Sequence, residues 1–75
     1  MKTIKLTVLN FDFYGNVNGT EKIWINTKSI FNFRHFERGE KTITKCTQLV
    51  YQDTGLTNST MYVEETPEQI FKLID

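Results

Sequence analysis

The side chains best suited to acid–base or nucleophilic chemistry are one histidine and one cysteine. His35 and Cys46 are the only residues of their types in the 75-residue chain. A histidine beside a cysteine can activate the thiol, and the two could meet if their segments form a hairpin. However, Arg34 and Phe36 flank His35, and neither would make it a stronger base. The sequence therefore favours a structural His35, an inert buried Cys46 and no enzymatic activity.

The acidic side chains gather once, at Glu64, Glu65 and Glu68. Neighbours on a strand point to opposite faces, so Glu64 and Glu65 would make a poor catalytic pair. They stand at the start of a predicted helix, where the helix dipole favours negative charge. The single histidine lies eleven residues before the single cysteine, and no glycine-rich phosphate loop is present. We therefore predict no metal site and no cofactor.

Aromatic and basic residues alternate in the middle of the chain. Phe33 and Phe36 are interleaved with Arg34, Arg38 and Lys41. Proteins that bind single-stranded nucleic acid combine aromatic platforms with basic grooves. Phenylalanines on strands belong first to the core, above all in a chain this short. Three roles remain open for this region: core packing, a protein interface and nucleobase stacking.

Trp24 is the most informative aromatic residue. It stands between Ile23 and Ile25, so on a strand it points away from the face that they share. If the isoleucines face the core, Trp24 lies outside as a binding anchor, or beneath the helix. The predicted binding residues are Trp24, Phe33, Arg34, Phe36, Arg38 and Lys41.

The elements that must position these residues are mostly β-strands. Alternating apolar and β-branched residues predict strands at about 3–13, 22–26, 30–36, 42–51 and 61–63. After Val8 the apolar residues change parity, which predicts a bulge near residues 8–10. Residues 15–19 are typical of a loop. In the third strand, alternation groups Phe31 with Phe33 and His35.

The chain closes with a predicted helix over about 67–74. Thr66 is a good N-cap, Pro67 occupies the favoured first position, and Gln69 completes a capping box. The apolar stripe of this helix comprises Ile70, Leu73 and Ile74, with Phe71 beside it. So short a helix is unstable alone, so its stripe must pack on the sheet or on a partner. We predict one α+β domain over residues 1–75, a four- to five-stranded, mainly antiparallel sheet or small open barrel with one C-terminal helix.

Length and charge limit the possible functions. A 75-residue chain buries little core, and a lone cysteine cannot form an internal disulfide, so we expect self-association. A net charge of zero argues against a general polyanion binder. Residues 1–45 hold eight Lys or Arg and four Asp or Glu (net +4), whereas residues 46–75 hold one and five (net −4). This division is typical of two solvated surfaces, or of a dipole that meets an acidic partner or another copy.

The compartment is predicted from three features. Residues 1–6 carry charge inside their apolar stretch and have no small-residue cleavage site, unlike a signal peptide. No window has the roughly 18 apolar residues that span a bilayer, so we expect no membrane insertion. A single reduced cysteine fits a cytoplasmic location.

Three segments resemble the small flagellar FlbD-like proteins. Residues 4–10 contain Lys-Leu-Thr-Val-Leu-Asn, residues 24–30 contain an apolar-Asn-x-x-x-Ile stretch, and residues 62–70 contain Val-x-Glu-Thr-x-Glu-x-Ile. The chain departs from that family in an extended first loop at residues 12–21 and a different middle at 31–60. The resemblance implies a shared fold and a non-enzymatic accessory role that acts through contacts, in an oligomer.

Together these features predict a small, non-enzymatic accessory module, phage- or flagellum-associated, that binds a protein partner or itself as a homo-oligomer. One alternative is a β module that binds single-stranded nucleic acid. Another is a phage-type inhibitor that sequesters a small ligand or a host factor.

Overall fold

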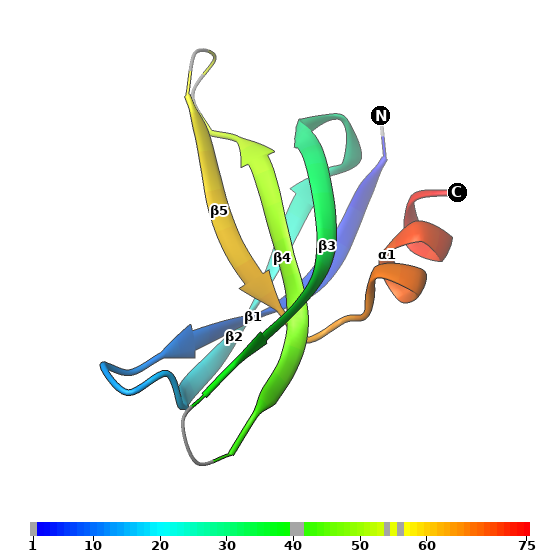
Figure 1. Ribbon diagram of the computed structural model, residues 1–75. Coiled ribbons are helices and arrows are strands. Elements are labelled where there is room, and N and C mark those ends of the chain that lie inside the picture. The colour runs from blue at the N-terminus through cyan, green and yellow to red at the C-terminus, as the bar shows by residue number, and fades with distance from the viewer. Residues whose placement is uncertain (1, 40–41, 54, 56) are drawn as a thin grey trace.

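The chain forms one five-stranded sheet and one helix (Figure 1). The computed structural model describes residues 2–39, 42–53, 55 and 57–75. The elements are β1 (Thr3–Phe11), β2 (Val17–Asn26), a 3-10 turn (Thr27–Ser29), β3 (Ile30–Arg38), β4 (Thr44–Gln52), β5 (Asn58–Val63) and α1 (Pro67–Ile74). The predicted α+β fold, an open antiparallel sheet with one C-terminal helix, is confirmed.

The strand order in the sheet is β2-β1-β5-β4-β3. The pairs β1–β2, β3–β4 and β4–β5 are consecutive in the chain and antiparallel. The central pair, β1–β5, joins strands that are distant in the chain, and among the described residues its register consists of Val8 opposite Val63. The sheet is therefore a hairpin joined to a three-stranded meander at one narrow junction, with β2 and β3 as its edges.

Several strand limits differ from the prediction. β2 begins at Val17 and β5 at Asn58, earlier than the predicted starts at residues 22 and 61. β1 ends at Phe11 rather than residue 13. The loop predicted at residues 15–19 is wrong in its second half, because pairing with β1 draws Gly19 into the ladder opposite Asn10. Cross-strand pairing thus overrides the weak strand preference of glycine and asparagine.

A register shift occurs where the β1–β2 ladder ends. Asn10 pairs with Gly19 and Phe11 with Val17, so Asn18 is the extra residue. The irregularity lies close to the bulge predicted at residues 8–10, but its extra residue belongs to β2. The apolar residues of β1 change parity after Val8 for another reason: residues on both faces of this strand are buried.

A second bulge changes the pattern of β3. Ile30 pairs with Tyr51 and Asn32 with Val50, which leaves Phe31 as the extra residue. Ile30 and Phe33 therefore both pack against the core, and Phe31 is exposed. The predicted grouping of Phe31 with Phe33 is wrong, because strict alternation fails across a bulge.

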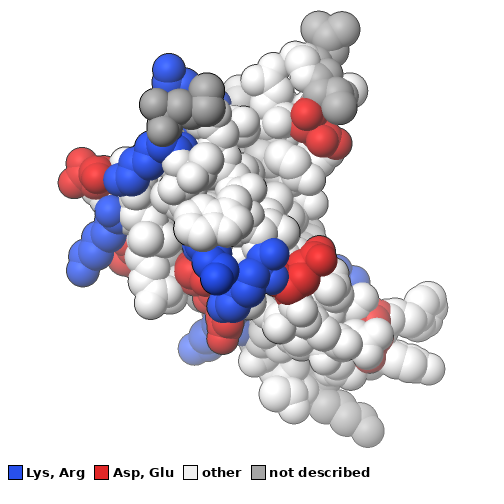
Figure 2. Space-filling model, turned by 180° about the vertical axis from the view of Figure 1, so that it is seen from behind, with Lys and Arg blue, Asp and Glu red and all other residues white. Residues whose placement is uncertain are grey.

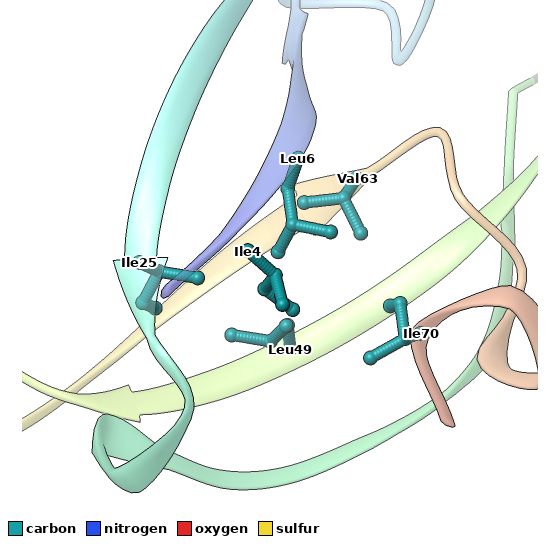
Figure 3. Close-up of a cluster of buried hydrophobic side chains, with 6 residues drawn as sticks. All are labelled: Ile4, Leu6, Ile25, Leu49, Val63 and Ile70. Atoms are coloured by element: carbon teal, nitrogen blue, oxygen red, sulfur yellow. The ribbon is translucent and has the colours of Figure 1, made fainter. Parts of the chain in front are cut away.

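The core is a cluster of six buried aliphatic residues (Figure 3). Its members are Ile4, Leu6, Ile25, Leu49, Val63 and Ile70. Four of the five strands and the helix each contribute at least one of them. Since Leu6, Leu49, Val63 and Ile70 have no exposed surface, the helix closes the core rather than resting on its rim.

The helix begins as the sequence predicts. The Thr66 side chain accepts a hydrogen bond from the Gln69 backbone, and the Gln69 side chain accepts one from the Thr66 backbone. Of the apolar stripe, Ile70 is fully buried and Ile74 partly buried, whereas Leu73 is exposed. At the other end, Lys2 Nζ donates to the carbonyl oxygens of Ile74 (3.4 Å) and Asp75 (3.0 Å), which suits the negative end of the helix dipole.

The junction between hairpin and meander is completed by one carboxylate. Glu65 Oε1 accepts from the Thr7 backbone N–H (2.8 Å), and Oε2 accepts from the Thr7 hydroxyl (3.0 Å). The Glu64 N–H donates to the Thr7 carbonyl (2.8 Å), and the Thr47 hydroxyl donates to the Glu65 carbonyl (2.6 Å). Side chain and backbone of Glu64 and Glu65 thus continue the ladder where β5 has ended.

Within the described part of the chain, no helix is long and apolar enough to cross a membrane.

We predict that Glu65→Gln lowers the free energy of unfolding by about 1–3 kcal/mol, since an amide offers one acceptor to two buried donors. Urea unfolding followed by circular dichroism measures the loss. Glu64→Gln is the matched control, because the Glu64 side chain is exposed and the charge change is the same. Equal losses in the two variants would contradict the role assigned to the Glu65 carboxylate.

We predict that Gly39→Ala is destabilising by about 1–3 kcal/mol. Gly39 has a φ of 131°, and a Cβ there would lie 2.0 Å from the Thr42 carbonyl oxygen. Gly19→Ala is the control, since a Cβ at Gly19 would meet nothing within 4 Å. Thermal melts of the two variants should differ clearly, and a neutral Gly39→Ala would refute the steric argument.

Candidate protein-interaction surface

Edge strand β3 carries four of the six predicted binding residues. Within the described part of the chain β3 pairs only with β4, so no strand occupies its second side there. Phe33 packs toward the core, and the alternation of a strand turns Arg34, Phe36 and Arg38 to the other face. We call the face of β3 that carries Phe33 the helix side, and the face that carries Arg34, Phe36 and Arg38 the outer side. The sixth predicted residue, Lys41, lies outside the described residues.

A shallow, open apolar groove lies on the helix side, between Phe33 of β3 and α1. Its volume is about 450 Å³, and its lining consists of Phe33, Pro67, Glu68, Phe71 and Lys72. Phe71 is 65% exposed, because it lies beside the stripe that Ile70 buries. A large aromatic side chain at the rim of an apolar groove is suited to hold a partner's side chain.

A second hollow, of about 480 Å³, lies against β3 and is lined by Asn32, Phe33, Arg34, Gln48 and Val50. Arg34 Nε donates to the Gln48 side-chain oxygen over 2.7 Å. This bond fixes the guanidinium on the sheet surface. Among the described residues, no carboxylate forms an ion pair with Arg34.

Phe36 and Arg38 are engaged within the molecule. The Phe36 ring lies 4.9 Å from that of Tyr62, and the Tyr62 ring lies 5.6 Å from that of Phe11. The Arg38 guanidinium lies 5.1 Å from the centre of the Phe11 ring. These side chains form a row across the outer side of the sheet that supports β3, and all three rings are partly buried.

Trp24 belongs to another strand than these residues. It is on β2, at the opposite edge of the sheet from β3. The isoleucines beside it face the core, and Trp24 itself is 67% exposed, which rules out the position beneath the helix. Lys5 Nζ stands 5.9 Å from the centre of its ring. The predicted set is therefore divided between edge strand β3 and a tryptophan on edge strand β2.

His35 and Cys46 do not oppose one another. The β3–β4 register sets His35 opposite Thr47, and Cys46 opposite Phe36. His35 Nε2 lies 3.0 Å from Glu37 Oε2, and this hydrogen bond lowers the pKa of the exposed Glu37 carboxyl. Burial raises the pKa of the Cys46 thiol, which disfavours the nucleophilic thiolate. Among the described residues, no three potential ligands lie close enough to hold a metal ion.

Basic and acidic side chains are less separated in the folded structure than they are along the chain. Basic and acidic side chains are interspersed on the face shown in Figure 2. Lys2, from the basic part, touches the acidic C-terminus, and Lys22 donates to the Thr7 hydroxyl that also binds Glu65. The arrangement shows no broad basic stripe on this face, of the kind that follows a nucleic-acid backbone.

Sequence reasoning missed Phe71 and Gln48 as parts of the surface. The sequence prediction sets Phe71 beside the apolar stripe but gives it no binding role, although its position next to Ile70 turns it about 100° around a helix. Its exposure could have been inferred from that angle. Gln48 acquires its role only through the β3–β4 register, which no local pattern gives.

We predict that Cys46 reacts with iodoacetamide at least about tenfold more slowly in the folded protein than in urea. The physical reason is burial, which keeps the thiol protonated and out of reach of the reagent. Mass spectrometry of timed samples measures the rate. Fast modification of the native protein would overturn the assignment of Cys46 as an inert core residue.

Comparisons with protein-family models, with curated proteins and with solved structures give no match.

Proposed function

We propose that this protein is a small, non-enzymatic module that binds another protein through the β3 edge and the groove beside it. The observation that carries the proposal is the 450 Å³ groove between Phe33 and α1, adjoining a strand that has no second partner among the described residues. Edge strands beside apolar grooves can accept extended segments of other chains. A cytoplasmic location is part of the proposal, because an unpaired buried cysteine fits a reducing compartment.

The exposed apolar surface supports this proposal. Phe31, at the start of β3, and Phe71, on the helix, are both largely exposed. The accessible surface is 5365 Å², against about 4,800 Å² expected for a compact monomer of 8.8 kDa. Exposed apolar surface such as that of Phe31 and Phe71 is suited to being covered by a partner.

Self-association is the second candidate, and the large accessible surface favours it as well. Small domains without disulfides or metals often gain stability by forming oligomers. The resemblance of residues 4–10, 24–30 and 62–70 to FlbD-like proteins supports an accessory role, phage- or flagellum-associated, in either case. Light scattering over about a hundredfold concentration range distinguishes a monomer from an oligomer, because assembly depends on concentration.

Selection of displayed random peptides on the immobilised protein tests the proposal directly. We expect peptides that bind the wild type, and we expect Phe71→Gln to weaken them at least about tenfold, since Phe71 forms the groove rim. Phe13→Gln is the matched control, because Phe13 is 93% exposed and belongs to the β1–β2 turn, outside the groove.

Peptides that lose affinity for Phe13→Gln and keep it for Phe71→Gln would place the contact elsewhere. An empty selection together with a monomer at every concentration would overturn the proposed function.

A further inference from the structure

We infer that the partner of this surface is an extended acidic segment that adds to β3 as a sixth strand. In this segment an apolar residue stands next to an acidic one, so that the first enters the groove beside Phe71 and the second reaches Arg34. The inference rests on the proposed function and specifies the chemistry of its ligand.

The backbone of β3 is suited to receive a strand. From Asn32 to Arg38 its pairing with β4 has no register shift, so this stretch is regular. A regular edge strand directs the N–H and C=O groups of every second residue away from its neighbour. Within the described part of the chain no strand pairs with these groups, so a partner's backbone can.

The two sides of β3 require different side chains from that partner. Phe33 and Arg34 are adjacent, so they face opposite sides, and the residues opposite them in an added strand must also be adjacent. On the helix side the apolar groove receives an aliphatic or aromatic side chain. On the outer side, Arg34 is one of the residues that line the hollow of about 480 Å³.

Charge selects an acidic residue for the outer side. Arg34 Nε is held by Gln48, which leaves the terminal N–H groups of the guanidinium for a carboxylate. Arg38 adds a second positive charge on the same side. The one acid of β3, Glu37, belongs to the helix side, where it pairs with His35 and stands opposite Lys45.

The same charges disfavour a second copy as the added strand. Pairing β3 with β3 of another molecule in one continuous sheet would bring two sets of Arg34 and Arg38 together on one face. Pairing β3 with the other free edge would bring Lys22 of β2 to that face, since it has the parity of the outward Trp24. Both arrangements oppose like charges, whereas an acidic segment does not.

Fluorescent peptides of roughly eight residues test the inference. One alternates valine with glutamate, and its matched partner has lysine in place of glutamate. We expect the glutamate peptide to bind at least about tenfold more tightly, and Arg34→Gln to reduce this ratio severalfold, because the charge contact is lost. Lys28→Gln, which removes an exposed charge outside β3, should leave the ratio unchanged. Hydrogen exchange should show new protection of alternate amides in residues 32–38.

Equal binding of the two peptides, or protection that appears on β2, would overturn the inference. If selected random peptides bind in a Phe71-dependent manner but carry no acidic preference, the inference fails while the proposed function stands. A dimer whose β3 amides are already protected without peptide would also refute it, because the second copy would then be the added strand.

Discussion

The carboxylate of Glu65 holds the two parts of this sheet together. Without it, the β1–β2 hairpin and the β3–β4–β5 meander would be joined by the shared aliphatic core, the pairing of Val8 with Val63 and the bonds made by neighbouring backbone groups. The helix follows this residue directly, since its N-cap is Thr66. The position of α1 over the core therefore depends on the same contact. Leaving two buried donors without their acceptor costs more free energy than an average hydrogen bond contributes to stability.

The proposed interaction surface depends on the Glu65 contact as well. The groove beside β3 exists because α1 leaves the sheet at Glu65 and returns across the core to bury Ile70. Phe71 is presented to solvent for the same reason, since one side of so short a helix can be buried and the rest must face outward. The outer side of β3 is held instead by the Phe36–Tyr62–Phe11 row. Two independent sets of contacts thus hold one edge strand in place.

The sequence predicted what is local and missed what depends on pairing. The capping box of Thr66 and Gln69 and the burial of Ile70 follow from spacing within one helix, and the structure contains both. The early start of β2 at Val17 and the bulge at Phe31 depend on partners elsewhere in the chain. Within the predicted site, the pattern identified β3 but could not distinguish Phe36 and Arg38, which are engaged internally, from Arg34, which is open. That distinction requires Tyr62, Phe11 and Gln48, which three other strands provide.

The strand order also determines how the chain must fold. Three of the four strand pairs are hairpins that close over short distances, and such contacts form quickly. The fourth requires Thr7 to find Glu65 across 58 residues, and closing so long a loop costs chain entropy before any contact is made. We therefore expect the hairpins to form early and the junction late. Until then the aliphatic faces of the hairpin and the meander stay open to water. The edges of β1 and β5 that later face each other have no hydrogen-bonding partner. This interval is the time when the nascent chain is most exposed to aggregation.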